Sequence, residues 1–83
     1  MSLTQSILFI AMEDINRIKV VLAEKKRTNK WLAQQLGKDP ATISKWCTNT
    51  SQPDLGTLKQ VALLLDVDIR ELIYRTKEEG HNL

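Results

Sequence analysis

Residues that begin or end helices recur at short intervals along this chain, so its helices can only be short. Thr28, Asp39, Asp54 and Asp68 each precede a run in which apolar residues recur every three or four positions. A Thr or Asp side chain at such a place accepts hydrogen bonds from the free N–H groups of a helix start. No stretch alternates apolar and polar residues for long enough to be a strand. The sequence therefore predicts an all-α fold.

The predicted helices are five, over residues 14–26, 29–36, 40–48, 55–65 and 69–74. Gly37 should end the second helix in the left-handed conformation, and Pro40 should open the third, where its missing N–H costs nothing. Helical spacing predicts the core. It consists of Ile15, Ile18, Val21, Leu22, Ile43, Trp46, Cys47, Leu55, Leu58, Val61, Ala62, Leu65, Ile69, Leu72 and Ile73.

Composition excludes several classes of protein. At 83 residues the chain is one small domain, and with 42% hydrophobic residues it is too apolar for disorder. The single Cys47 cannot form an internal disulfide, and with the lone His81 it supplies too few ligands for zinc. No nucleophile has a base at a recognisable spacing, and there is no glycine-rich phosphate loop. We expect no enzymatic activity, no metal and no cofactor.

No membrane segment is expected either, because nothing approaches the roughly 20 apolar residues of a membrane span. The longest apolar stretch is residues 7–12. A secretory signal requires Lys or Arg before such a stretch, and none is present. We expect a cytoplasmic protein. Its expected division is an N-terminal extension at 1–12, which is either a dimer contact or not native to the protein, a domain at 13–75 and a polar tail at 76–83.

Positive charge is concentrated in the middle of the chain. Residues 17–50 hold eight basic and two acidic side chains, a net charge of +6, whereas residues 1–16 and 51–83 each carry −2. A basic stripe of this kind can bind the phosphate backbone of a nucleic acid. Charge alone is equally compatible with an ordinary solvated face.

The second and third predicted helices are joined by only three residues, 37–39, which is the spacing of a helix-turn-helix. The small Ala33 lies one turn before Gly37 and lets the two helices cross closely. The apolar positions of this unit are Leu32, Leu36, Ile43 and Trp46.

From residue 18 to residue 73 the chain resembles the Cro and lambda-repressor type, or XRE, family of helix-turn-helix proteins. The resemblance rests on Leu32-Ala33-Gln34-Gln35-Leu36-Gly37, Thr42-Ile43-Ser44-Lys45-Trp46, Pro53 with Leu55 and Leu58, Val61-Ala62 with Leu65, and Leu72-Ile73. It implies a five-helix lambda-repressor-like fold and a sequence-specific regulator that binds double-stranded DNA. A repressor that acts as a homodimer, with the third helix in the major groove, is the expected form.

Two departures from the family pattern occur together. The family often has Arg at the position of Leu22 and Glu at that of Cys47, which form a buried ion pair. A pair lost at both ends leaves no stranded charge, and packed apolar groups can replace it without loss of stability. Cys47 is therefore expected to be a small buried apolar residue rather than a redox switch.

The resemblance also implies which residues meet DNA. Pro40 and Ala41 stand where the family often places Gln residues that read adenine. The expected base contacts are Ala41, Ser44, Lys45 and Thr48, with Lys45 reaching guanine or only phosphate and Ala41 touching a thymine methyl. Contacts to the DNA backbone are expected from Thr28, Asn29, Lys30, Lys38, Thr42, Asn49, Thr50 and Ser51.

A protein-interaction module, such as an antitoxin or an adaptor with the same fold, is the alternative function. Leu63 and Leu64 stand where family members often carry polar or small residues, and Ile7, Leu8, Phe9 and Ile10 have no place in the five-helix core. Extra apolar surface of this kind marks an interface, either with a protein partner or between two copies of the chain.

Overall fold

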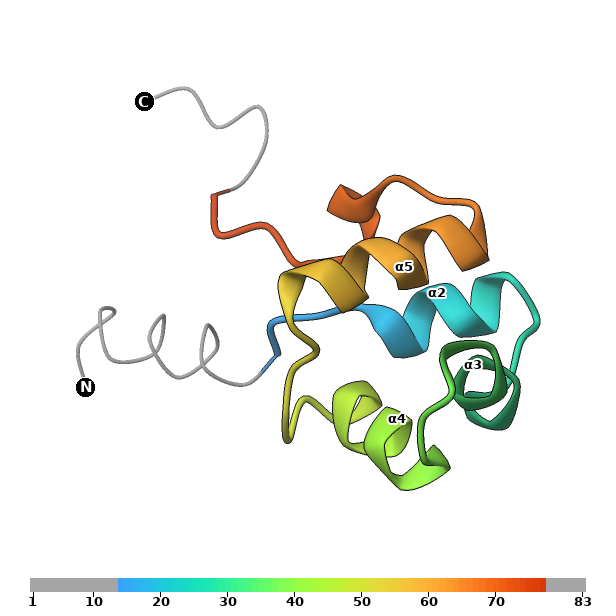
Figure 1. Cartoon of the computed structure of the whole chain (residues 1–83). Coiled ribbons are helices and arrows are strands. Elements are labelled where there is room, and N and C mark those ends of the chain that lie inside the picture. Colours follow the sequence, from blue (N-terminus) through green and yellow to red (C-terminus); the bar gives the residue numbers. More distant parts are fainter. Residues whose placement is uncertain (1–13, 78–83) are drawn as a thin grey trace.

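The computed structural model describes residues 14–77 and shows an all-α fold (Figure 1). Its helices are α2 (Ile18–Glu24), α3 (Asn29–Leu36), α4 (Pro40–Cys47) and α5 (Leu55–Leu65), followed by the 3-10 turn η1 (Ile69–Leu72). Four of the five predicted α-helices are thus present. The predicted extension at 1–12 and the tail residues 78–83 lie outside the described residues.

Side-chain caps set the starts of α3, α5 and η1. The hydroxyl of Thr28 accepts a hydrogen bond from the N–H of Trp31 at 3.0 Å, and a carboxylate oxygen of Asp54 accepts from the N–H of Thr57 at 2.7 Å. The Thr57 bond lowers the pKa of Asp54, because it stabilises the carboxylate. Asp68 and Glu71 form a capping box at η1. These three caps confirm the predicted helix starts.

The turn between α3 and α4 has the predicted glycine and proline but lacks the predicted side-chain hydrogen bond of Asp39. Gly37 has φ 67° and ends α3 in the left-handed conformation. Pro40 opens α4. Asp39 is the N-cap residue of α4, as predicted, but its side chain makes no capping hydrogen bond, so that part of the prediction is wrong.

The first helix begins four residues later than predicted, at residue 18 rather than 14. Helix α2 starts at Ile18, because the side-chain oxygen of Asn16 accepts the N–H of Ile18 at 3.0 Å and ends the extended segment before it. Asn16 pairs with Ile73 in an isolated antiparallel bridge. Ile15 is consequently 52% exposed, so its predicted place in the core is wrong.

The same bridge shortens the predicted fifth helix. The N–H of Tyr74 donates to the carbonyl of Ile15 at 3.0 Å, and the N–H of Arg17 donates to the carbonyl of Leu72 at 2.7 Å. These bonds hold residues 73–74 extended, so only the 3-10 turn η1 forms. Leu72 is fully buried as predicted, whereas Ile73 is exposed and not in the core.

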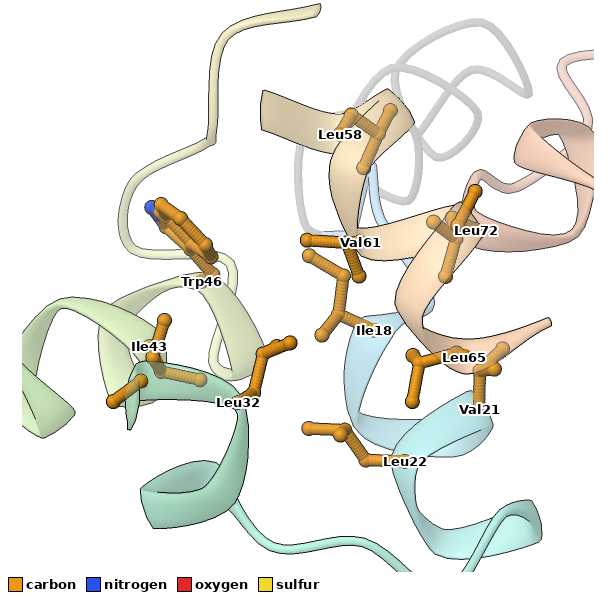
Figure 2. Close-up of a cluster of buried hydrophobic side chains, with 12 residues drawn as sticks. Ile18, Val21, Leu22, Leu32, Ile43, Trp46, Leu58, Val61, Leu65 and Leu72 are labelled. Carbon is orange, nitrogen blue, oxygen red and sulfur yellow. The ribbon is translucent and has the colours of Figure 1, made fainter. Parts of the chain in front are cut away.

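All five elements contribute to one core, and Figure 2 shows their side chains pointing toward one another. Leu55 was expected there but is 77% exposed in the first turn of α5. Cys47 and Ile69 are only partly buried against the core. The buried residues are Ile18, Val21, Leu22, Leu32, Ala33, Ile43, Trp46, Leu58, Val61, Ala62, Leu65 and Leu72.

Candidate nucleic-acid interface

Helix α4 separates its side chains into a core face and a solvent face. Ile43 and Trp46 are buried against α3 and the rest of the core. Ala41, Ser44 and Lys45 are exposed on the other side, and Thr48 is exposed directly after the helix. The four residues expected to read bases therefore lie together, because positions three and four apart share one face of a helix.

The start of α3 presents backbone N–H groups to solvent. Thr28 caps the N–H of Trp31, while those of Asn29 and Lys30 have no acceptor among residues 14–77. Such N–H groups and the helix dipole favour an anion at this end. The Lys30 side chain is exposed beside them.

An aromatic contact adds a cation to the same helix start, and the sequence analysis missed it. The guanidinium of Arg27 lies over the Trp31 ring, 4.5 Å from its centre. Such stacking orders the guanidinium at an otherwise exposed position. The four-residue spacing of Arg27 and Trp31 was the only signal in the sequence, and it was not decisive because Arg27 precedes α3 and lies outside any helix.

The turn between the helices carries Lys38, which is exposed. Its ammonium lies close enough to Asp54 to contribute to the lowered pKa of that carboxyl, after the hydrogen bonds from Thr57. Thr42, another expected backbone contact, is only half-buried on α4. Both residues therefore have solvent access, Lys38 from the turn and Thr42 from the first turn of α4.

The loop after α4 is held by its own hydrogen bonds. The N–H groups of Thr50 and Ser51 donate to the carbonyl of Lys45 at 2.9 and 3.3 Å. The hydroxyl groups of Thr48 and Thr50 are 2.8 Å apart. Thr50 and Ser51 are exposed, and their backbone bonds to Lys45 keep them beside the end of α4.

Asn49 is an expected backbone contact whose side chain bonds to a segment more than 30 residues away in the sequence. Its oxygen accepts the N–H groups of Ile15 and Asn16, each at 2.8 Å, and its amide donates to the carbonyl of Asn16 at 3.1 Å. The residue is half-buried in the left-handed conformation at φ 59°. A phosphate contact from Asn49 stays a prediction, and the internal bonds give it a second role.

Cys47 lies between the start of α3 and the end of α4. Its thiol donates weakly to the side-chain oxygen of Asn29 at 3.4 Å. Burial raises the pKa of the Cys47 thiol, while the nearby Lys19 lowers it by a smaller amount. A thiol with a raised pKa is a poor nucleophile, which agrees with the expected packing role.

The sequence profile of the Cro/C1-type helix-turn-helix DNA-binding domain matches residues 17–78. The chain belongs to this family. It therefore binds DNA through its helix-turn-helix, formed here by α3 and α4 (Figure 1). The family consists of non-enzymatic DNA-binding domains.

A solved structure supports this assignment. It is the crystal structure of a Bacteroides fragilis protein to which DNA binding is ascribed, and that protein is 65% identical to this chain. The match has a TM-score of 0.72 and covers 72% of this chain and 97% of the other. Among curated proteins, none matches this chain. Within residues 14–77, no helix is long and apolar enough to cross a membrane.

Proposed function

We propose that the protein is a sequence-specific transcriptional repressor that places α4 in the major groove of its operator. The observation that carries this proposal is the division of α4, whose outer face holds small and polar side chains while Ile43 and Trp46 anchor its inner face. A helix needs such a face to approach base edges closely. Repression requires only that the bound protein occupies DNA that a polymerase needs. The proposed location is the cytoplasm.

Each exposed residue of α4 has a chemically distinct part in this proposal. Lys45 donates to O6 and N7 of guanine, and the methyl group of Ala41 touches that of thymine. The Ser44 hydroxyl donates to or accepts from a base edge, whereas the Thr48 hydroxyl, which donates within the protein, accepts from one. The Thr48 hydroxyl also lies 3.2 Å from the carbonyl of Ser44, so it is already oriented.

Phosphate contacts fix the register of α4 in the groove. In this proposal the free N–H groups at the start of α3 receive one phosphate, with Lys30 and the stacked Arg27 beside it. Lys38 and Thr42 contact the backbone from the turn and α4. Asn49, Thr50 and Ser51 meet the strand at the other end of α4.

The test begins with selection of bound sequences from random duplex DNA, followed by affinity measurements on the best sequence and on single-base variants. Lys45→Ala should cost roughly 1 to 3 kcal/mol and relax the preference at one base pair. Lys30→Ala should weaken binding to all sequences alike and flatten the salt dependence by about one counterion. Lys59→Ala is the matched control, because Lys59 is exposed on α5 outside the helix-turn-helix.

Two outcomes would contradict these roles. Absence of a preferred sequence at moderate salt would refute a sequence-specific regulator while leaving general DNA binding intact. An equal loss on every sequence for Lys45→Ala would make this residue a phosphate contact.

The repressor is further proposed to bind as a homodimer. One helix-turn-helix covers only a few base pairs, so two copies on half-sites about 34 Å apart are the usual source of specificity. Leu63 and Leu64 of α5 are 72% and 36% exposed, and with Leu36 they line a shallow pocket between α3 and α5. A second copy covering this apolar surface would remove it from water. Residues 1–12 are proposed to contribute to the same contact.

A further inference from the structure

A buried asparagine far from α4 in sequence makes side-chain bonds to the end of that helix. Asn16 is 4% exposed and is the one buried polar residue within 14–77. Its side-chain amide donates to the carbonyl of Trp46 at 2.8 Å and to the side-chain oxygen of Gln52 at 2.7 Å. Both partners lie more than 25 residues later, at the end of α4 and in the loop that follows.

The bonds between this segment and the loop run in both directions. The backbone N–H of Asn16 donates to the side-chain oxygen of Asn49, and the Asn49 amide returns a bond to the Asn16 carbonyl. Gln52 donates to the same Asn49 oxygen at 3.2 Å. The three side chains, Asn16, Asn49 and Gln52, form one connected set that we term the asparagine bridge.

The position of the asparagine bridge matters because of what it holds. Trp46 is the last buried residue of α4, and its carbonyl, in the last turn of the helix, accepts the backbone N–H of Asn49 at 3.0 Å and has room for a second donor. Asn16 supplies a donor to that carbonyl from the segment before α2. The end of α4 is thus held by backbone bonds from the loop that follows it, such as that of Thr50 to Lys45, and by the side-chain bond from Asn16.

We propose that Asn16 is a positioning residue for DNA recognition, acting through Trp46 and Asn49 to hold the end of α4 and residues 48–52 in register with the DNA. Because Asn16 is buried, it does this without touching the DNA. Recognition of bases requires side chains held within about half an ångström, and an unsupported helix end would have to be ordered anew at each binding event. This role depends on the proposed docking of α4 in the major groove.

Asn16→Ser separates the two tasks of the residue. A Ser oxygen can still accept the N–H of Ile18 two residues on, but the shorter side chain cannot reach Trp46 or Gln52. The matched control is Leu65→Ala, which destabilises the core from α5, across the core from Trp46 in Figure 2. Both full-length variants are compared with the parent at a temperature where all three are folded.

Two measurements are made on each variant. Amide hydrogen exchange at Thr50, whose N–H donates to Lys45, should become faster in Asn16→Ser relative to exchange in α5, and should not do so in Leu65→Ala. The affinity for the selected operator should fall about tenfold in Asn16→Ser, which corresponds to loss of roughly one net hydrogen bond. In Leu65→Ala it should stay within about twofold.

The outcomes separate this proposal from the function on which it rests. If Asn16→Ser binds the operator as the parent does, or if Leu65→Ala loses as much affinity, the positioning role is refuted. If the parent itself selects no sequence, the proposed function fails. Thr50 exchange in Asn16→Ser that is as slow as in the parent would independently refute the role of the asparagine bridge. Should Asn16→Ser not fold, Asn49→Gly replaces it. Glycine adopts the left-handed backbone of Asn49 readily, and the change removes the side-chain bonds of Asn49. Thr50 exchange in Asn49→Gly that is as slow as in the parent would again refute the role.

Discussion

Gly37 and Gly56 differ in backbone conformation, and the difference gives opposite expectations for the same substitution. Gly37 has φ 67°, where a side chain is strained even though a Cβ there would meet no atom within 4 Å. Gly56 lies in the first turn of α5, where a Cβ would touch a carboxylate oxygen of Asp54 at an ordinary 3.6 Å. The turn requires glycine for its backbone alone, and α5 does not require it.

Gly37→Ala is expected to lower the free energy of unfolding by about 1 kcal/mol, the cost of an alanine in the left-handed region. Gly56→Ala is expected to raise it by about 0.5 kcal/mol, because alanine favours the helix and restricts the unfolded chain. Urea denaturation of both variants measures the two changes. Shifts of the same sign would show that sterics, rather than backbone conformation, determine the effect at one of the two positions.

At the scale of the helices, α2 and α4 meet through apolar groups where the family often has an ion pair. Leu22 is buried, and Lys19, one turn earlier on α2, lies close enough to Cys47 to influence the pKa of its thiol. Leu22 therefore lies on the α2 face that is turned toward α4. Apolar contact here avoids the cost of removing two charges from water.

Restoring the ion pair tests this contact. Leu22→Arg alone should destabilise the domain by about 3 kcal/mol, because it buries a charge without a partner. The double variant Leu22→Arg with Cys47→Glu should recover to within about 1 kcal/mol of the parent, since the two charges then compensate each other. Thermal denaturation of the parent, both single variants and the double variant gives the coupling. Additive losses would mean that the two positions do not face each other.

The elements that the sequence predicted well are those whose ends depend on neighbouring residues. Helices α3, α4 and α5 begin and end within one residue of the predicted positions, because Thr28, Gly37, Pro40 and Asp54 act locally. The start of α2 and the end of η1 depend instead on Asn16 pairing with Ile73, which are 57 residues apart. No local pattern carries that pairing, so the prediction made both segments helical.

The candidate site follows the same division. The exposure of Ala41, Ser44 and Lys45 follows from the spacing of Ile43 and Trp46, and could be predicted from the sequence. The internal bonds of Asn49 could not, because they depend on Asn16 lying beside the loop in the fold. The residue type indicated that Asn49 makes polar contacts, but not that its side chain bonds to the segment before α2.

At the scale of the whole molecule, the apolar surface on α5 lies apart from the surface proposed for DNA. Figure 1 shows α5 and α4 on either side of α2. Leu63 and Leu64 would therefore remain available to a second copy while α4 occupies a groove. Leu55, also on α5, is about as exposed as Leu63 but lies at the other end of the helix.

Leu63→Ser is expected to convert the proposed dimer to a monomer at tens of micromolar, because it removes apolar surface that the contact would bury. Leu55→Ser is the matched control and should leave the sedimentation coefficient of the dimer unchanged, since Leu55 lies outside the pocket that Leu36, Leu63 and Leu64 line. Both residues are exposed, so neither variant should lose much stability. A chain starting at Met12 completes the set: dissociation of this shorter chain would assign residues 1–11 to the contact, and a dimer would exclude them. A monomeric parent would refute the solution dimer, and pairing on the operator would then have to be driven by DNA.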